Sequence, residues 1–192
     1  MMYKKIIFSS FVFLIAIYIP LFTVYAQEST SSASNSGLIP STIPTPVDYQ
    51  LPYPGMLPDN PLYFLKVMRD NLTAFFLSKP IDKANFDLLQ SDKNVQASYL
   101  IVTQQPGKTL LAFQTFSQAQ DYFDQALTQA QNAKKQGYST KDFAGKLSNA
   151  NQKHEQILQA LAQERHQSSS QTVQKEQDRV QTFTKEIGSL QQ

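Results

Sequence analysis

The stretch YPGMLPDNPLYFLKVMRDNLTAFFL, residues 53–77, decides how the chain is organised. Residues 54–58 contain two prolines and a glycine, which are typical of turns. Asp59 or Asn60 can accept hydrogen bonds from the free amides of a helix start, and Pro61 suits the first helical position. The stretch therefore predicts the point at which a linker becomes a folded helical domain.

The second half of this stretch carries apolar residues at three- and four-residue steps, which is the pattern of one face of a helix. They are Leu62, Leu65, Met68, Leu72, Phe75 and Phe76. We expect this face to be buried, so that replacing Phe75 or Phe76 by Ala would cost about 3–5 kcal/mol. We also expect Tyr53, Leu57 and Tyr63 to pack on the rest of the domain.

Upstream, residues 1–26 have the features of a secretory signal peptide. Lys4 and Lys5 precede a long apolar run, and Val24-Tyr25-Ala26 provides small residues for cleavage after Ala26. The alternative is an uncleaved membrane anchor, because residues 6–24 would span about 28 Å as a helix. Both interpretations predict that the rest of the chain is extracytoplasmic: secreted, periplasmic or at the cell surface.

A linker is predicted between the leader and the helical domain, over residues 27–52. It is rich in Ser, Thr and Pro and has few side chains that could form a core. We expect a disordered, extended tether. Residues 53–192 are then expected to form one helical domain.

The remaining sequence predicts four more helices, separated by breakers such as Pro106-Gly107 and Gly137. We expect one from Pro80 or Ile81 to about Gln104 and one from Thr109 to Gln136. A third begins at Ser139 or Thr140, with Ser139 and Asp142 resembling a capping box. After a break at residues 168–170, a last helix carries apolar residues from Val173 to Leu190.

Short connections make neighbouring helices antiparallel, so the fold class is all-α, an antiparallel helical bundle. The last two helices are rich in Gln and have few large apolar residues. We expect them to form a long helical hairpin or coiled-coil arm, with the better core in the aromatic-rich first three helices.

Composition excludes several functions. The chain has no cysteine, so disulfides, thiolate metal sites and a cysteine nucleophile are excluded. Without Lys4 and Lys5 of the leader, 15 basic residues balance 15 acidic ones, and the basic face expected of a nucleic-acid-binding protein is missing. Partners are therefore expected to be protein or envelope components, with self-association left open and the membrane contacted only through an uncleaved leader.

A search for catalytic motifs predicts a protein that is not an enzyme, with no catalytic, cofactor-binding or metal-binding residues and no cofactor. His154 and His166 would lie about 18 Å apart on a helix, too far to share a metal, and His154 falls on an apolar stripe.

Three pairs are interpreted as solvated helix surface: Asp121 with Asp124, Glu176 with Arg179, and Asp82 with Asn85. A hydrolase using the two aspartates is the least favoured alternative. Asn71-Leu72-Thr73 matches a glycosylation sequon, but we interpret it as chance because Leu72 is expected to be buried.

Residues 53–66, YPGMLPDNPLYFLK, resemble the signature of an uncharacterised family of exported bacterial helical proteins, a domain of unknown function with the opening motif P-G-x-L-P-D-[S/N]-P-L-Y-x-L-K. The resemblance covers roughly residues 54–102. It implies export and an all-helical body and brings no catalytic residues.

These patterns predict a non-enzymatic, extracytoplasmic interaction or structural module of the bacterial cell envelope. The alternative is an extracytoplasmic chaperone-like or stress-sensing protein, because polar helices of this kind can expose hydrophobic grooves to client chains.

Overall fold

The computed structural model describes residues 48–105, 107–163 and 170–191 of the chain. The predicted leader, the linker up to residue 47, and the expected break at residues 168 and 169 lie outside the described residues.

Five helices make up the described part of the chain, which contains no strand. They are α2 (Tyr63–Phe76), α3 (Pro80–Gln104), α4 (Thr109–Lys135), α5 (Lys141–Gln163) and α6 (Ser170–Gln191). The all-α prediction is confirmed. The predicted bounds of α3 and α4 are also close to those observed, whereas α2 begins after Pro61 and ends before Lys79.

Local residue chemistry explains several of these ends. Pro80 occupies the first turn of α3, where its missing N–H is not needed. After α4, Gly137 adopts a φ of +84°, and the Tyr138 N–H reaches back 3.0 Å to the Ala133 carbonyl. This is the hydrogen bond of a Schellman-type helix end, which favours glycine. The predicted capping box before α5 is not formed among the described contacts; instead the Thr140 hydroxyl donates to the Leu190 carbonyl at 3.2 Å.

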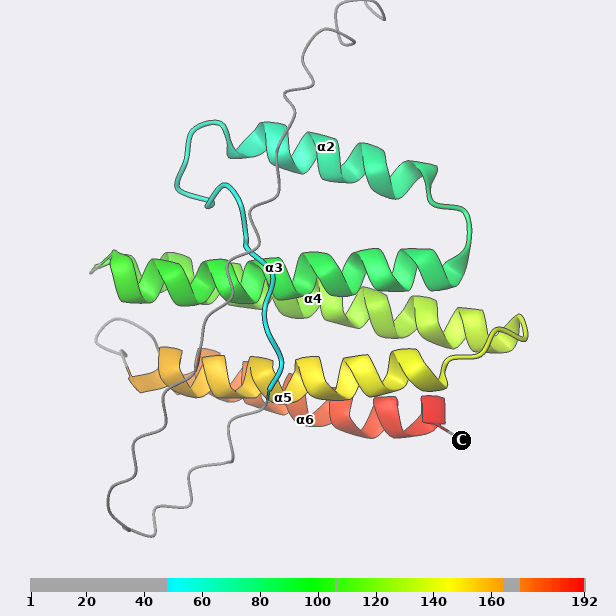
Figure 1. The fold of residues 1–192 in the computed structure, drawn as a ribbon. Helices are drawn as coiled ribbons and strands as arrows, with labels where there is room; N and C mark the ends of the chain where they lie inside the picture. The colour runs from blue at the N-terminus through cyan, green and yellow to red at the C-terminus, as the bar shows by residue number, and fades with distance from the viewer. Residues whose placement is uncertain (1–47, 106, 164–169, 192) are drawn as a thin grey trace, which may run out of the picture. The chain divides into compact units, whose positions relative to one another are not determined.

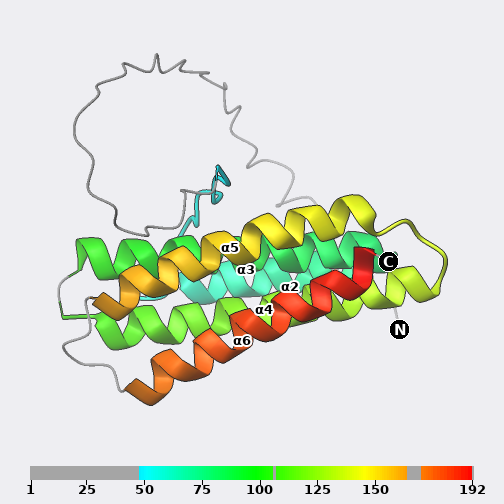
Figure 2. The ribbon, with the colours of Figure 1, turned by 90° about the horizontal axis from the view of Figure 1, so that it is seen from below.

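The helices lie in three layers, with sequential helices antiparallel (Figure 1). In the middle layer, α3 and α4 lie side by side. On one side of this layer is α2, and on the other are α5 and α6, as the view from below in Figure 2 also shows. The most extensive contact is between α3 and α4, and α5 and α6 pack on them and on each other.

The core consists of two hydrophobic clusters, and each contains residues from α3, α4, α5 and α6. In the first, the Phe123 ring of α4 lies 4.9 Å from the Phe183 ring of α6, centroid to centroid. The second contains Phe113 and Phe116 of α4 together with Leu158 of α5. The expectation of an extended arm was therefore wrong. The hairpin of α5 and α6 forms half of the core, because its sparse apolar residues lie opposite the phenylalanines of α4.

Small and polar residues allow the close contact between α3 and α4. Several alanines on both helices are fully buried, including Ala84, Ala112 and Ala126. The buried Ser91 hydroxyl of α3 donates to the Ala119 carbonyl of α4 at 2.8 Å. Because α3 has neighbours on both sides, it also buries polar side chains that its apolar stripe does not explain: Gln90, Asp92, Asn94 and Ser98.

The contrast between core and surface phenylalanines gives a stability prediction. Phe123 is fully buried, whereas Phe75 is 81% exposed. Replacing Phe123 by Ala should lower the free energy of unfolding by about 3–5 kcal/mol, because it leaves a cavity. The same substitution at Phe75 should change it by less than about 0.5 kcal/mol. Urea unfolding followed by far-UV circular dichroism measures both, and equal losses for the two variants would contradict this structure.

Candidate interaction surface

Helix α2 turns its less apolar side toward the bundle. The residues on this side, which we call the inner face, are Tyr63, Lys66, Val67, Asp70 and Ala74, followed by Leu77 at the helix end. All are buried or half-buried, and Asp70 is the most buried residue of the helix. Their spacing of three and four residues places them on one side of the helix.

Ion pairs and hydrogen bonds satisfy the polar groups of the inner face. The Asp70 carboxylate accepts a hydrogen bond from Arg69 at 2.7 Å and lies 3.7 Å from the Lys66 ammonium. The Tyr63 hydroxyl lies 3.5 Å from the side-chain oxygen of Asn94 on α3, at the outer limit of hydrogen bonding. Burial lowers the pKa of Lys66, and the neighbouring Asp70 opposes this shift. The charge pairs of the inner face thus lie within α2 and neutralise its buried carboxylate, while Tyr63 supplies the contact to α3.

Two further groups face this layer from the helices below. Burial raises the pKa of the Tyr122 hydroxyl on α4, and the charges of Asp70 and Asp87 raise it further. Burial also raises the pKa of Asp87 on α3 to about 6, and the opposing charge of Lys83 is the smaller effect. Tyr122 therefore lies within electrostatic range of carboxylates from both α2 and α3.

The opposite side of α2, which we call its outer face, is apolar and faces solvent. It consists of Phe64, Leu65, Met68, Leu72, Phe75 and Phe76. Phe64 is 60% exposed, Phe75 81% and Phe76 73%. A phenylalanine carries roughly 200 Å² of surface, so these three residues alone expose on the order of 400 Å². With the leucines and the methionine, the outer face exceeds the largest apolar patch of most soluble monomers.

The sequence prediction that this stripe is buried was wrong. Phe75 and Phe76 contact each other edge to face, with ring centroids 5.6 Å apart. Both rings are nevertheless largely exposed. The physical reason is that the polar inner face is satisfied where it lies, because Asp70 pairs with Arg69 and Lys66 and Tyr63 lies beside Asn94 of α3, so the apolar face points away from the bundle. Leu72 is also exposed, which removes the reason for dismissing the sequon at Asn71, although nothing in the structure shows that Asn71 is modified.

The segment before α2 is held at both of its ends. Asn60 accepts a hydrogen bond from the Leu62 N–H at 2.9 Å in the turn ahead of the helix. The N-cap of α2 is Leu62, which makes no side-chain capping hydrogen bond, so the predicted cap at Asp59 or Asn60 was wrong. Asp59 pairs with Lys108, just before α4, at 2.9 Å. Leu57 packs against the second hydrophobic cluster, as expected, but Tyr53 is 80% exposed, so its predicted packing was wrong.

Tyr49, rather than Tyr53, fastens this segment to the bundle. Its hydroxyl donates to one oxygen of Asp92 at 2.5 Å, and the ring packs against the first cluster. The other oxygen of Asp92 lies 2.9 Å from Nε2 of His154 on α5. Since a carboxylate only accepts, Nε2 carries the proton. Burial raises the pKa of the Tyr49 hydroxyl, and the charge of Asp92 and the hydrogen bond from Tyr49 to Asp92 raise it further. The packed chain therefore begins before Tyr53.

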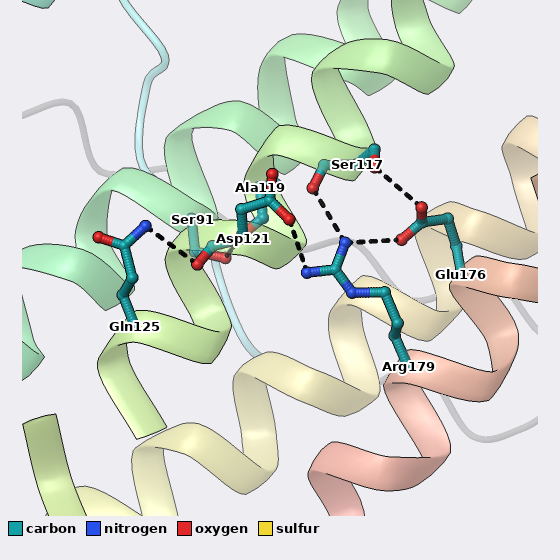
Figure 3. A network of polar contacts seen from close by, with 7 residues as sticks. All are labelled: Ser91, Ser117, Ala119, Asp121, Gln125, Glu176 and Arg179. Atoms are coloured by element: carbon teal, nitrogen blue, oxygen red, sulfur yellow. Dashed lines mark hydrogen bonds and ion pairs between the residues drawn. The ribbon is translucent and has the colours of Figure 1, made fainter. Parts of the chain in front are cut away.

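A second polar network joins α4 to α6 (Figure 3). Arg179 donates to Asp121 at 2.8 Å and lies 3.4 Å from Glu176, and the buried Glu176 also accepts from the Ser117 hydroxyl at 2.9 Å. Asp121 is thus engaged in an ion pair between helices. Asp124 lies instead in an open groove of about 610 Å³, lined mostly by polar side chains of α6.

The remaining residues considered from the sequence do not form a site in the described structure. His154 is fully buried, with its ring edge-on to Phe123 at 5.3 Å between centroids. His166 lies outside the described residues. Asn85 donates to the Ile81 carbonyl rather than to Asp82. Within residues 48–105, 107–163 and 170–191, no group of three or more His, Asp or Glu side chains could hold a metal ion.

Comparison with known proteins adds no relative. No protein-family model matches the chain, and neither the curated proteins nor the solved structures provide a match. The resemblance of residues 53–66 to a family of exported helical proteins therefore stays a prediction.

The raised pKa of Asp87 predicts a pH-dependent contribution to stability. Its pKa is 3.8 in the unfolded chain and about 6 in the folded one, so the favourable contribution is fully present below 3.8 and lost above about 6. Asp87→Asn, which cannot ionise, should therefore stabilise the protein at about pH 8. Two pKa units would correspond to about 3 kcal/mol, but the group is partly solvated, so we expect about 1 kcal/mol.

Urea unfolding at several pH values measures this difference. The gain should shrink toward zero as the pH falls through the range from about 6 to 3.8. The exposed Asp124→Asn variant serves as the control and should show no such gain. A gain for Asp87→Asn that is equal at both ends of this range would contradict the assignment to Asp87 ionisation.

Proposed function

We propose that the chain is a non-enzymatic interaction module of the bacterial cell envelope, that it works outside the cytoplasm, and that it binds through the outer face of α2. The observation that carries this proposal is the direction of that face. Six large apolar side chains point away from the bundle on a helix whose only carboxylate, Asp70, is buried on the opposite side. Large exposed apolar patches mark interaction sites.

The remaining features support a binding role rather than catalysis. The buried carboxylates at Asp92 and Glu176 are each engaged with side chains of neighbouring elements, so that both serve the packing of the bundle. The groove beside Asp124 is open and lies on the α6 side of the described structure, away from the outer face of α2. The apolar leader predicted for residues 1–26 supports the extracytoplasmic location.

Cysteine accessibility tests this function in the cell, because the natural chain has no cysteine and each introduced one is unique. Leu72→Cys lies on the outer face of α2, and Lys185→Cys is an exposed control on α6. In intact cells whose outer layers admit the reagent, a membrane-impermeant maleimide should label Lys185→Cys but not Leu72→Cys. After detergent extraction and purification, both should react.

Two outcomes would contradict the proposal, and each concerns a different part of it. Failure to label Lys185→Cys in intact cells, with labelling after lysis, would place the domain in the cytoplasm. Equal labelling of both positions in intact cells would mean that nothing covers the outer face of α2.

The same exposed face favours a second candidate, an extracytoplasmic chaperone-like or stress-sensing protein. An unfolded client exposes apolar side chains that could cover the outer face of α2. This function predicts that the purified protein suppresses the aggregation of a reduced client, and that Phe75→Ser with Phe76→Ser abolishes the effect. Lack of suppression by the natural chain would exclude it, while leaving the proposed interaction module intact.

A further inference from the structure

We infer that the partner of the outer face of α2 is a lipid bilayer surface, with α2 lying in the plane of the membrane interface. This inference rests on the proposed function, because it names the partner of the same face. It also extends the sequence prediction, which expected membrane contact only through an uncleaved leader.

The distribution of apolar side chains fits a bilayer surface. They follow the whole length of α2, from Phe64 in its first turn to Phe76 at its last residue. A helix with an apolar face that includes phenylalanine and leucine lies in an interface with that face about 5–10 Å deep. None of the helices in the described part of the chain is long and apolar enough to cross a membrane.

The charges around the outer face are complementary to anionic lipid. Residues 61–79 contain one acidic residue, Asp70, and it is buried on the inner face. The exposed charged residues of this range are Arg69, whose guanidinium also pairs with Asp70, and Lys79, and both are basic. Each basic residue close to an anionic membrane surface adds to the attraction, while the apolar side chains enter the interface.

A second copy of the chain is a less suitable partner. In a two-fold dimer the same surface patch meets itself. Arg69 lies in the middle of α2, so antiparallel pairing of two outer faces would bring the two Arg69 side chains close together. Like charges would then oppose the contact, whereas on an anionic bilayer they favour it.

The predicted leader places the domain near the same membrane. Residues 6–24 are the apolar run that enters the bilayer during export or stays there as an anchor. If the anchor stays, the helical domain is tethered to the membrane that the leader enters. Stable attachment to a membrane takes two such signals, and α2 would supply the second.

The experiment places a fluorescent label at single cysteines introduced into the full chain. The protein is purified with its leader in whatever state, cleaved or uncleaved, the producing cell gives it. Leu72→Cys and Met68→Cys report on the outer face of α2, and Lys185→Cys on α6 is the matched exposed control. The labelled proteins are combined with vesicles of phosphatidylcholine containing about a third phosphatidylglycerol, made with and without brominated acyl chains, which quench only labels that enter the bilayer.

The expected result is that brominated lipid quenches at least about half of the emission at Leu72→Cys and Met68→Cys and less than about a tenth at Lys185→Cys. Vesicles without phosphatidylglycerol should give weaker quenching, and Lys79→Gln should reduce the difference between the two lipid compositions. Because the control shares the same leader, attachment through residues 6–24 alone cannot produce this pattern.

Two other results would overturn the inference, and they separate it from the proposed function. If unlabelled Leu72→Cys chains on vesicles form disulfide-linked dimers and their labelled forms are not quenched by brominated lipid, the outer face binds a second copy. The lipid inference then fails, and the interaction module survives. If the labels on α2 remain as accessible to aqueous iodide as Lys185→Cys, and Leu72→Cys is also labelled in intact cells, both proposals fail.

Discussion

A helix can turn only one of its sides toward the bundle, and in α2 the side that contains Asp70 is turned inward. A buried carboxylate must be paired, and Asp70 has Arg69 and Lys66 beside it. The same rotation directs Tyr63 toward Asn94 on α3. Since the apolar residues lie on the other side of the helix, they have no bundle to enter. The pairing within α2 allows this carboxylate to be buried, and the candidate interaction surface then faces outward.

Much of the bundle could be predicted from the sequence, because its helix ends and its core stripes have local causes. Pro80 and Gly137 mark a start and an end that hold in the structure. The stripe from Val173 to Leu190 is buried as its spacing predicts, even though α6 has few large apolar residues. What the sequence did not predict is that the large phenylalanines of α4 pack against the sparse apolar residues of α5 and α6. This packing joins segments that are distant in the sequence.

The orientation of α2 could not be predicted in the same way. An amphipathic pattern shows that one side of a helix is apolar, and the usual inference that this side meets the core depends on what the neighbouring helices offer. The sequence did contain one indication of this orientation, which lies outside the apolar stripes. The middle of α3 carries Gln90, Lys93 and Asn94, which is unusual for a helix with neighbours on both sides. Such a helix can accept a partner with polar side chains, and the inner face of α2 provides one.

The same argument accounts for the lead-in segment. The sequence favoured Tyr53 as the packed residue and placed Tyr49 in the predicted tether, although the two side chains have the same chemistry. In the structure Tyr49 is the packed residue, because its hydroxyl reaches one oxygen of the buried Asp92. The other oxygen of Asp92 accepts a hydrogen bond from His154. This contact is made between residues far apart in sequence, from the lead-in segment, α3 and α5. Local patterns contain no information about it.

Exposing the apolar outer face of α2 to water is unfavourable, and covering that face with a partner would offset this free-energy cost. Burying about 400 Å² of phenylalanine surface is worth on the order of 10 kcal/mol before the costs of association. That gain is available only if α2 keeps its orientation while its outer face is covered. The Tyr63–Asn94 contact of the inner face and the Asp59–Lys108 ion pair before α2 meet this requirement, because both connect α2 or its lead-in segment to the bundle on the side that the partner does not touch. A bilayer would then cover α2 alone, with α5 and α6 facing away from the membrane, on the far side of the layer formed by α3 and α4.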